Sequence, residues 1–213
     1  MEKLTRDDLP GLFAAAAEMM AEKAEELGRM DALLGDGDLG LTMKKGFEAL
    51  PALVRDLPEP DAGMAIAKAG MKLSSIIPST MGFLMGSGLL SGGRAVSGAE
   101  AIGAAEYAAF WRGFSEGVMK RGKCSPGDCT VLDAIEAASA GAEAYLRETP
   151  GASLADTAVA ARDGALAGAE STRRLTPKFG KAAVHQAAAA GVMDQGAYAG
   201  YCLAAAFCRY IEK

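Results

Sequence analysis

Residues 31–42 concentrate the chemically distinctive side chains of this sequence. Asp31, Asp36 and Asp38 lie within eight residues, and the stretch also contains three glycines, two of them between the aspartates. A helix would spread the carboxylates around its circumference, whereas a glycine-rich loop can turn all three toward one point. Carboxylates that converge need a compensating cation, and a few carboxylates completed by phosphate oxygens are the usual ligands of Mg²⁺. The stretch therefore predicts a magnesium site, with a solvated acidic turn between two helices as the alternative.

Composition limits the classes of function. The 213 residues have a net charge of −5, which argues against nucleic acid or an anionic membrane as the main partner. No apolar run is long enough for a membrane span and residues 1–8 lack a signal-peptide pattern, so we expect a cytoplasmic protein. One histidine and four cysteines without a C-x-x-C spacing argue against a zinc site and favour reduced thiols. We expect residues 1–213 to form a single domain.

Apolar residues recur at helical spacing along most of the chain. No stretch alternates with a period of two, so the sequence predicts an all-α protein without a sheet. Gly28 is expected to end the first helix, and the prolines from Pro51 to Pro60 to form a stiff connector. Short connectors favour an antiparallel, barrel-like eight-helix bundle. The expected helices cover about residues 9–27, 42–54, 62–75, 80–96, 100–121, 130–147, 154–174 and 196–211.

In an up-and-down bundle, every second loop lies at the same end. The loops expected beside the aspartate loop are residues 75–80, 122–129 and 175–195. These three are rich in glycine, serine and proline, and their backbone N–H groups and the following helix N-termini are suited to binding phosphate. The sequence thus predicts a metal and anion site in the loops at one end of the bundle.

The aspartate motif resembles that of a known family. Residues 35–43, with Asp31 upstream, resemble the signature of the L subunit of dihydroxyacetone kinase, which reads Asp, four residues, then Gly-Asp-x-Asp-His-Gly-x-Asn-Met. The resemblance implies that Asp31, Asp36 and Asp38 hold two Mg²⁺ ions that clamp the phosphates of ADP or ATP. It also places Leu39, Gly40 and Thr42 at the nucleotide. Leu39 replaces the family's histidine and Thr42 its asparagine; threonine can still donate a hydrogen bond, but leucine cannot.

A second block, residues 70–87, resembles the family segment that ends in Gly-Gly-x-Ser-Gly-Pro-Leu-x-Gly-Thr. The resemblance implies nucleotide contacts at Ser79, Thr80, Met81 and Gly82. Pro78 and Ser79 replace the glycine pair, and Met81 replaces a serine that contacts phosphate in the family. The alternative is that Ser79 and Thr80 only cap the next helix.

Residues 121–133 resemble the family's Arg-Gly-Lys-x-x-Pro-Gly-Asp-Lys-Thr-Met-x-Asp. The resemblance places Gly122, Thr130 and Val131 at the nucleotide, with Val131 against adenine, and Cys129 stands where lysine is usual. A Pro-Gly turn with Thr130 as the cap of the next helix would explain most of these residues as well. The two interpretations are compatible, because a capped helix start is itself an anion site.

The last loop departs most from the family pattern. Lys181 stands for the family's arginine in Gly-Arg-Ala, which keeps the charge but loses the planar, bidentate fork. Asp194 and Gly196 match the family's Gly-x-x-Asp-Pro-Gly-Ala, which here lacks its proline. His185 has no acidic or cysteine companion nearby in the sequence, so we expect a surface or packed histidine.

The resemblance implies the nucleotide-binding subunit of a dihydroxyacetone-kinase-type phosphotransferase, with no catalytic residue beyond the metal ligands. A separate K subunit would hold the hydroxyketone. In one branch of the family a phosphohistidine-bearing M subunit of the phosphotransferase system recharges bound ADP, and in the other branch ATP exchanges. The alternative is a non-catalytic regulatory paralogue that binds metal and nucleotide. The sequence does not indicate which ketose is the acceptor.

Overall fold

The computed structural model describes residues 1–213, except for the side chain of His185. Short 3₁₀ turns cover Arg6–Asp8, Thr172–Arg174 and Ala182–His185. No strand occurs in the described chain beyond one isolated bridge between Leu4 and Ile102, so the expected all-α class is confirmed. No helix in this part of the chain combines the length and the apolar character needed to cross a membrane. The helices are α1 (Leu9–Glu22), α2 (Ala24–Ala32), α3 (Leu39–Asp56), α4 (Ala62–Ile76), α5 (Thr80–Ala95), α6 (Ala104–Gly122), α7 (Val131–Glu148), α8 (Leu154–Ser171), α9 (Gln186–Ala189) and α10 (Gln195–Ile211).

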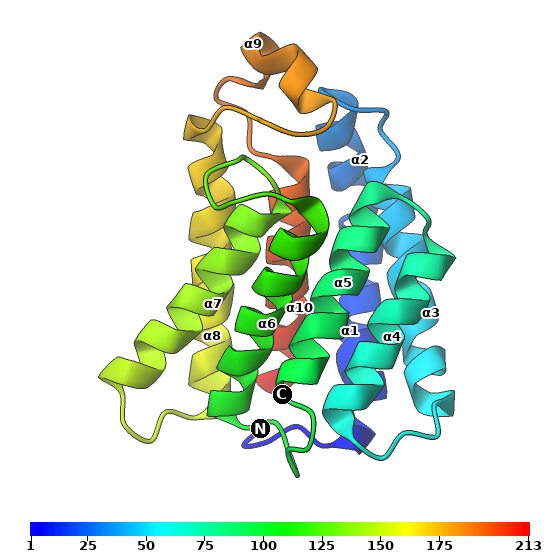
Figure 1. Cartoon of the computed structure of the whole chain (residues 1–213), viewed down its shortest axis with the longest axis vertical. Coiled ribbons are helices and arrows are strands. Elements are labelled where there is room, and N and C mark those ends of the chain that lie inside the picture. Colours follow the sequence, from blue (N-terminus) through cyan, green and yellow to red (C-terminus); the bar gives the residue numbers. More distant parts are fainter.

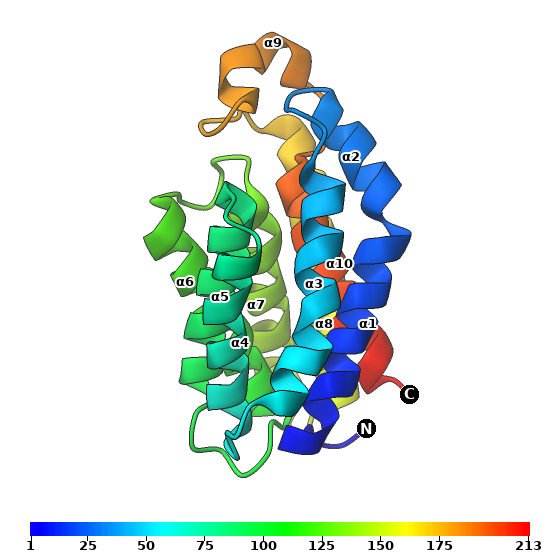
Figure 2. The same cartoon turned by 90° about the vertical axis from the view of Figure 1, so that its right-hand side faces the viewer.

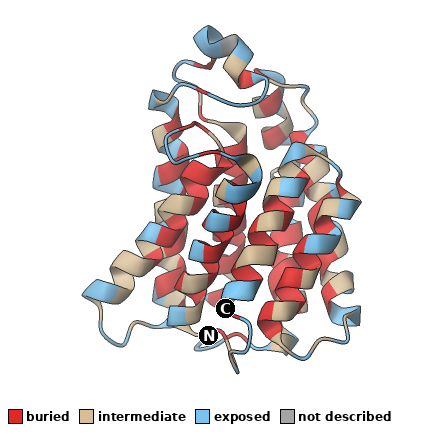
Figure 3. Ribbon diagram, viewed as in Figure 1, coloured by how far each residue is buried: buried red, intermediate tan, exposed pale blue. Residues whose placement is uncertain are grey.

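The eight long helices form a closed ring. Helices α1, α3, α4, α5, α6, α7, α8 and α10 each pack against the next, and α10 returns to α1 (Figures 1 and 2). Buried residues line the inner faces of the ring (Figure 3), and its centre is filled by large side chains, among them Trp111, Phe114 and Phe207. The predicted antiparallel eight-helix bundle is therefore confirmed, with two short helices, α2 and α9, added at one end.

The first predicted helix differs from the structure at its end. Gly28 does not end a helix: the chain bends at Lys23, and α2 continues through Gly28 to Ala32. Asp31 consequently lies in the last turn of α2 and not in the loop. A Cβ atom at Gly28 would lie 3.3 Å from the carbonyl oxygen of Gly37, and one at Gly40 would lie 1.8 Å from that of Ala24. These glycines are needed because the backbones of α2, the aspartate loop and α3 touch.

The second predicted helix was too short. Helix α3 begins at Leu39 and runs through Pro51 to Asp56, so the connector starts six residues later than the prolines suggested. Proline removes one hydrogen bond from a helix. Phe47 and Leu50 before Pro51, and Val54 after it, are fully buried. Their burial on one continuous face stabilises the helix on both sides of the proline, at about 1.5–3 kcal/mol per large side chain.

The start of α6 also differs from the prediction. The helix begins at Ala104 and not near residue 100, because Ile102 exchanges backbone hydrogen bonds of 2.8 and 2.9 Å with Leu4. The N–H of Gly103 then donates to the Glu106 carboxylate at 3.0 Å, which caps the first turn. A partner 98 positions away in the chain thus decides where this helix starts.

Candidate functional site

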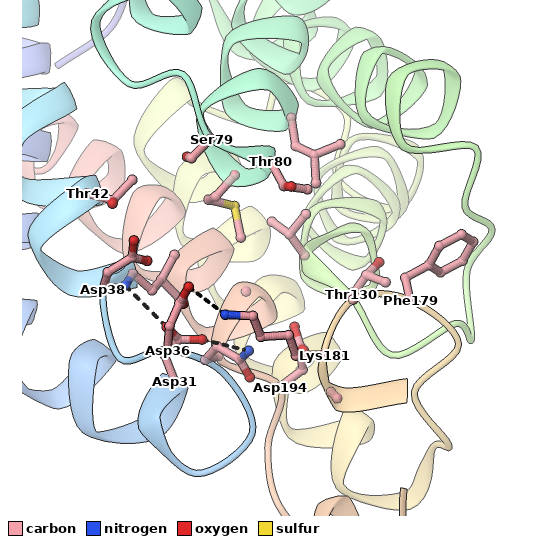
Figure 4. A pocket seen from close by; sticks show the side chains of 18 of the residues that line it. Asp31, Asp36, Asp38, Thr42, Ser79, Thr80, Thr130, Phe179, Lys181 and Asp194 are labelled. Atoms are coloured by element: carbon pink, nitrogen blue, oxygen red, sulfur yellow. Dashed lines mark hydrogen bonds and ion pairs between the residues drawn. The ribbon is translucent and has the colours of Figure 1, made fainter. Parts of the chain in front are cut away.

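The predicted loops meet at one end of the bundle, away from both termini (Figure 1). They surround a cleft of about 350 Å³, within the range of small-molecule sites. Most of the residues predicted at the site line this cleft (Figure 4): Asp31, Asp36, Asp38, Leu39, Thr42, Ser79, Thr80, Met81, Thr130, Val131, Lys181, Asp194 and Gly196.

Three of the predicted glycines lie elsewhere. Gly40 packs against the backbone of Ala24 in α2, and a Cβ atom at Gly82 would lie 2.0 Å from the carbonyl oxygen of Ile77. Gly122 lines a second pocket, which adjoins the cleft. Gly40 and Gly82 therefore allow helices and loops to approach each other, which accounts for them without a nucleotide contact.

The three aspartates converge as their spacing suggested. One carboxylate oxygen of each lies within 4.8 Å of those of the other two. Asp31 is buried, whereas Asp36 and Asp38 are exposed. The loop reaches this shape through its glycines, since Gly37 has a φ of +79° and a Cβ atom at Gly35 would lie 2.2 Å from Asp31 Oδ1. The result is a set of hard oxygen donors open to the cleft, which fits Mg²⁺.

Asp31 is held in place from three directions. Its Oδ2 accepts hydrogen bonds from the N–H groups of Gly37 (2.9 Å) and, more weakly, Leu39 (3.4 Å). Its Oδ1 accepts one from the Gln195 side chain at 3.2 Å. Leu39 is the first residue of α3, so the helix N-terminus also favours the negative charge. Gln195 is 164 positions away, and nothing in the local sequence indicated this contact.

Lys181 supplies a cation to the cluster. Its Nζ lies 2.5 Å from Asp36 Oδ2. This hydrogen bond is the main cause that lowers the pKa of Asp36. It is also the main cause that raises the pKa of Lys181, and Asp31 and Asp38 raise it further. Because both side chains are largely exposed, the pair is weak enough for a divalent ion to displace the ammonium group.

The Lys181→Met variant is accordingly expected to bind free Mg²⁺ more tightly than the unaltered protein, by up to about fivefold, because the competing ammonium group is gone. Calorimetric titration with MgCl₂ in the absence of nucleotide measures this. The matched control is Lys178→Met in the same segment, since Lys178 pairs with Asp128 at 2.6 Å and not with the cluster. An unchanged or weaker affinity for Mg²⁺ in Lys181→Met would contradict the competition.

Helix N-termini border the opposite side of the cleft. Ser79 caps α5, its Oγ accepting a hydrogen bond from the N–H of Gly82 at 3.1 Å. Ser79 and Thr80 also line the cleft, so the capping interpretation and the site interpretation are both compatible with the geometry. Met81 presents a thioether there, and a Cβ atom at Gly196 would lie 2.9 Å from Met81 Cε. The apolar side chain of Met81 thus lies at a helix N-terminus, where a polar side chain could donate a hydrogen bond to a phosphate group.

The Pro-Gly-Asp loop is shaped by its own carboxylates. Thr130 caps α7, accepting from the N–H of Leu132 at 3.2 Å. Asp133 accepts from the N–H groups of Gly127 (2.6 Å) and Thr130 (2.7 Å), which completes a capping box. Asp128 accepts from the N–H of Ser125 at 2.7 Å and pairs with Lys178, which ties this loop to the segment after α8.

Asp194 caps α10, with one carboxylate oxygen accepting from the N–H of Ala197 at 2.7 Å. Burial raises the pKa of Asp194 to about 7, and the nearby charges of Asp133 and Asp31 add to this rise. The cleft therefore holds a carboxyl group with a raised pKa, whereas the pKa of Asp36 in the same cleft is lowered. The hydrogen bond from Ala197 is sufficient to explain Asp194 as the N-cap of α10.

Sequence reasoning missed several lining residues. Leu84, Cys129, Phe179 and Gln195 also border the cleft. Phe179 is the one that a sequence signal could have indicated, because this aromatic residue lies between Lys178 and Gly180 in a segment without helical spacing of apolar residues. Cys129 is buried, with a φ of +60°. The prediction for His185 concerns a side chain outside the described residues.

Comparison with known proteins identifies relatives. The DAK2 domain model matches residues 33–209. D-erythrulose kinase of Mycolicibacterium smegmatis is 32% identical over 187 residues, which cover 87% of this chain and 32% of that protein. The ADP-binding subunit DhaL of the PEP-dependent dihydroxyacetone kinase of Escherichia coli is 26% identical over 130 residues, 61% of this chain and 62% of that protein. The chain therefore spans about a third of the length of the erythrulose kinase.

A solved structure has the same fold. The dihydroxyacetone kinase of C. freundii, in complex with AMP-PNP and Mg²⁺, superposes with a TM-score of 0.70 at 21% identity. The match covers 98% of this chain and 35% of that protein. The DAK2 domain match and the similarity to DhaL confirm the resemblance inferred from the aspartate motif. The matched residues run from the aspartate loop into α10, and the chain belongs to the DAK2 domain family, whose matched relatives include kinases.

Proposed function

We propose that the chain binds ADP or ATP with two Mg²⁺ ions in the cleft and presents the nucleotide for phosphoryl transfer to a hydroxyketone held by a K-type partner subunit. The observation that carries this proposal is the convergence of Asp31, Asp36 and Asp38 across one cleft from the N-termini of α5 and α7. Carboxylates suit a metal ion and helix N-termini suit an anion. The phosphate groups of a nucleotide with bound Mg²⁺ require both kinds of group: carboxylates for the metal ions and N–H donors for the phosphate oxygens.

Each part of the cleft has a role in this proposal. Asp31, kept in position by Gly37 and Gln195, holds metal together with Asp36 and Asp38. The bound ions would neutralise charge on the phosphate oxygens, since phosphoryl transfer depends mainly on positioning and electrostatics. Lys181, released from Asp36, can turn its ammonium group to a phosphate oxygen. Residues 79–82 and 130–131 offer the first N–H groups of two helices.

We propose that partner subunits bind the hydroxyketone that accepts the phosphoryl group. The curated erythrulose kinase matched here is about three times as long as the part that this chain covers, so the chain corresponds to one portion of such an enzyme. We infer that a K-type subunit supplies the hydroxyketone site. Where ADP is recharged in place, a phosphohistidine-bearing M subunit of the phosphotransferase system would dock at the same end.

A regulatory paralogue is the second candidate. Leu39 and Met81 face the cleft where the family motif has a histidine and a serine, and Thr42 replaces an asparagine. Two of these changes remove a hydrogen-bonding group. Such a protein would bind metal and nucleotide without transfer, and turnover with the partner subunit distinguishes the two candidates.

The altered contacts predict that ADP exchanges with solvent and does not co-purify. Each hydrogen bond lost to a phosphate is worth about 1–3 kcal/mol, so two losses weaken binding by roughly 30-fold to well over a thousandfold. Chromatography of the nucleotide released from denatured protein after gel filtration measures this. Stoichiometric ADP would contradict it, and would mean that Ser79, Thr80 or Lys181 supply the missing contacts.

Restoring one donor makes the same test quantitative. Met81→Ser should tighten Mg²⁺-dependent ADP binding by roughly 10- to 150-fold, as expected for one hydrogen bond to a charged group. Met71→Ser is the matched control, because Met71 is exposed on α4 and does not line the cleft. Equal affinities in Met81→Ser and the unaltered protein would place the phosphates away from α5.

A further inference from the structure

Helices α4 and α5 differ from the rest of the chain in charge. Residues 62–99, which include both helices, contain no Asp or Glu, although the chain has 27 acidic residues and a net charge of −5. The basic residues of this stretch are Lys68, Lys72 and Arg94. Because the two helices lie side by side in the ring (Figures 1 and 2), they form a basic region on an otherwise acidic protein.

Two of these basic side chains are available to a partner. Lys68 is already paired with a carboxylate at 2.6 Å. Lys72 and Arg94 are exposed and have no ion-pair partner among the described side chains. At the end of the neighbouring helix α6, Arg121 is also exposed, and its guanidinium group lies over the ring of Phe83, 4.6 Å from the centroid. The positive charge thus continues from α4 across α5 to α6.

Exposed apolar side chains accompany these charges. Met71 on α4 is 57% exposed and Phe83 on α5 is 36% exposed, although most large apolar side chains are buried in the core. Methionine, aromatic residues and arginine are the types that are enriched at protein–protein interfaces. The outer surface formed by Met71, Lys72, Phe83 and Arg94, here called the α4–α5 face, therefore has the composition of an interface.

The α4–α5 face is rigid because the two helix backbones touch. A Cβ atom at Gly63 would lie 2.5 Å from the carbonyl oxygen of Gly93, and one at Gly70 would lie 2.5 Å from that of Gly86. No side chain separates the helices at these positions, so the face changes little in shape when a partner binds. A preformed surface loses little conformational entropy on binding, which favours affinity.

The face also adjoins the cleft. The turn between α4 and α5 ends at Ser79, and Ser79 and Thr80 line the cleft. A protein that covers the α4–α5 face would therefore reach the rim of the cleft, where the proposed phosphoryl transfer occurs. A second copy of this chain fits the face poorly, because two such faces would bring Lys72 and Arg94 of one copy against the basic residues of the other.

We propose that the α4–α5 face is the docking surface for the subunit that holds the phosphoryl acceptor, and that this subunit binds it through an acidic surface with apolar residues at its centre. The inference rests on the proposed function and specifies the partner interface. Lys72 and Arg94 attract the acidic surface, and Met71 becomes buried against its apolar residues. Attraction of this kind accelerates association and is weakened by salt.

The test measures binding of the purified K-type subunit from the same source by calorimetry, at about 50 mM and about 0.5 M NaCl. Lys72→Glu should weaken binding by at least about tenfold at the lower salt concentration and by less at the higher one, because salt screens the repulsion. Met71→Asp should weaken binding by at least about tenfold at both concentrations, because it places a charge in the apolar part of the interface.

Two matched controls carry the same changes on other faces. Arg147→Glu alters an exposed residue in the last turn of α7, and Leu166→Asp alters a 39% exposed residue on α8. Neither should change binding of the K-type subunit. All four variants should bind ADP with Mg²⁺ as the unaltered protein does, since none of the altered residues lines the cleft.

The outcomes separate this inference from the proposed function. Equal binding of the K-type subunit by the unaltered protein and both face variants would overturn the docking face while the proposed function stands. Dimerisation of the unaltered protein that Met71→Asp abolishes, or binding to phosphatidylserine vesicles that Lys72→Glu abolishes, would overturn it by assigning the face to another occupant. Absence of any binding between the K-type subunit and the unaltered protein would overturn the partner role in the proposed function, and the docking face with it.

Discussion

Asp36→Asn and Asp38→Asn are each expected to weaken Mg²⁺-dependent ADP binding by more than about a hundredfold. Removing even an outer-shell partner of a bound metal costs roughly 10- to 100-fold in affinity, and these carboxylates would contact the metal directly. Calorimetric titration with ADP, with and without Mg²⁺, measures the effect. In the variants the Mg²⁺-dependent part of the affinity should disappear.

The same variants should remain folded. Asp36 and Asp38 are exposed, and neutralising either relieves repulsion within the cluster, so the melting temperature should be unchanged or slightly higher without nucleotide. Asp163→Asn is the matched control, since Asp163 is an exposed carboxylate on α8 that pairs with Arg162. If both cluster variants bound ADP with unchanged affinity, the aspartate loop would be a solvated acidic turn and not a metal site.

The second large effect concerns the partner. The isolated chain is expected to show no phosphorylation of dihydroxyacetone or erythrulose, because its cleft is assigned entirely to metal and nucleotide. Turnover should appear when a K-type subunit from the same source is added with ATP, or with the phosphotransferase components. A coupled assay of phosphorylated ketose measures both states.

Two variants serve as controls for the reconstituted assay. Asp36→Asn should abolish reconstituted turnover while the protein still associates with the K-type subunit. Asp163→Asn should support full turnover. Turnover by the chain alone would refute the assignment of the acceptor to a partner. Nucleotide binding without turnover in the reconstituted mixture would favour the regulatory paralogue.

Local sequence determined most of the helices and their caps. Helical spacing of apolar residues depends on neighbours three and four positions away, so it could be read directly for the helices around Phe47, Phe110 and Phe207. Ser79, Thr130 and Asp194 cap helices through N–H groups two or three residues ahead. Because every second loop of an up-and-down bundle lies at the same end, counting the helices placed the aspartate loop beside the three glycine- and serine-rich loops.

The tertiary structure alone decided how the site is assembled. Asp31 lies on α2 because α2 and α3 touch at Gly28 and Gly40, a contact that overrides the tendency of glycine to end a helix. Gln195 reaches Asp31 across 164 positions and Lys181 reaches Asp36 across 145. Such contacts depend on where whole helices pack, so no local pattern encodes them. The sequence thus specified which residues have the chemistry, and packing specified which of them meet.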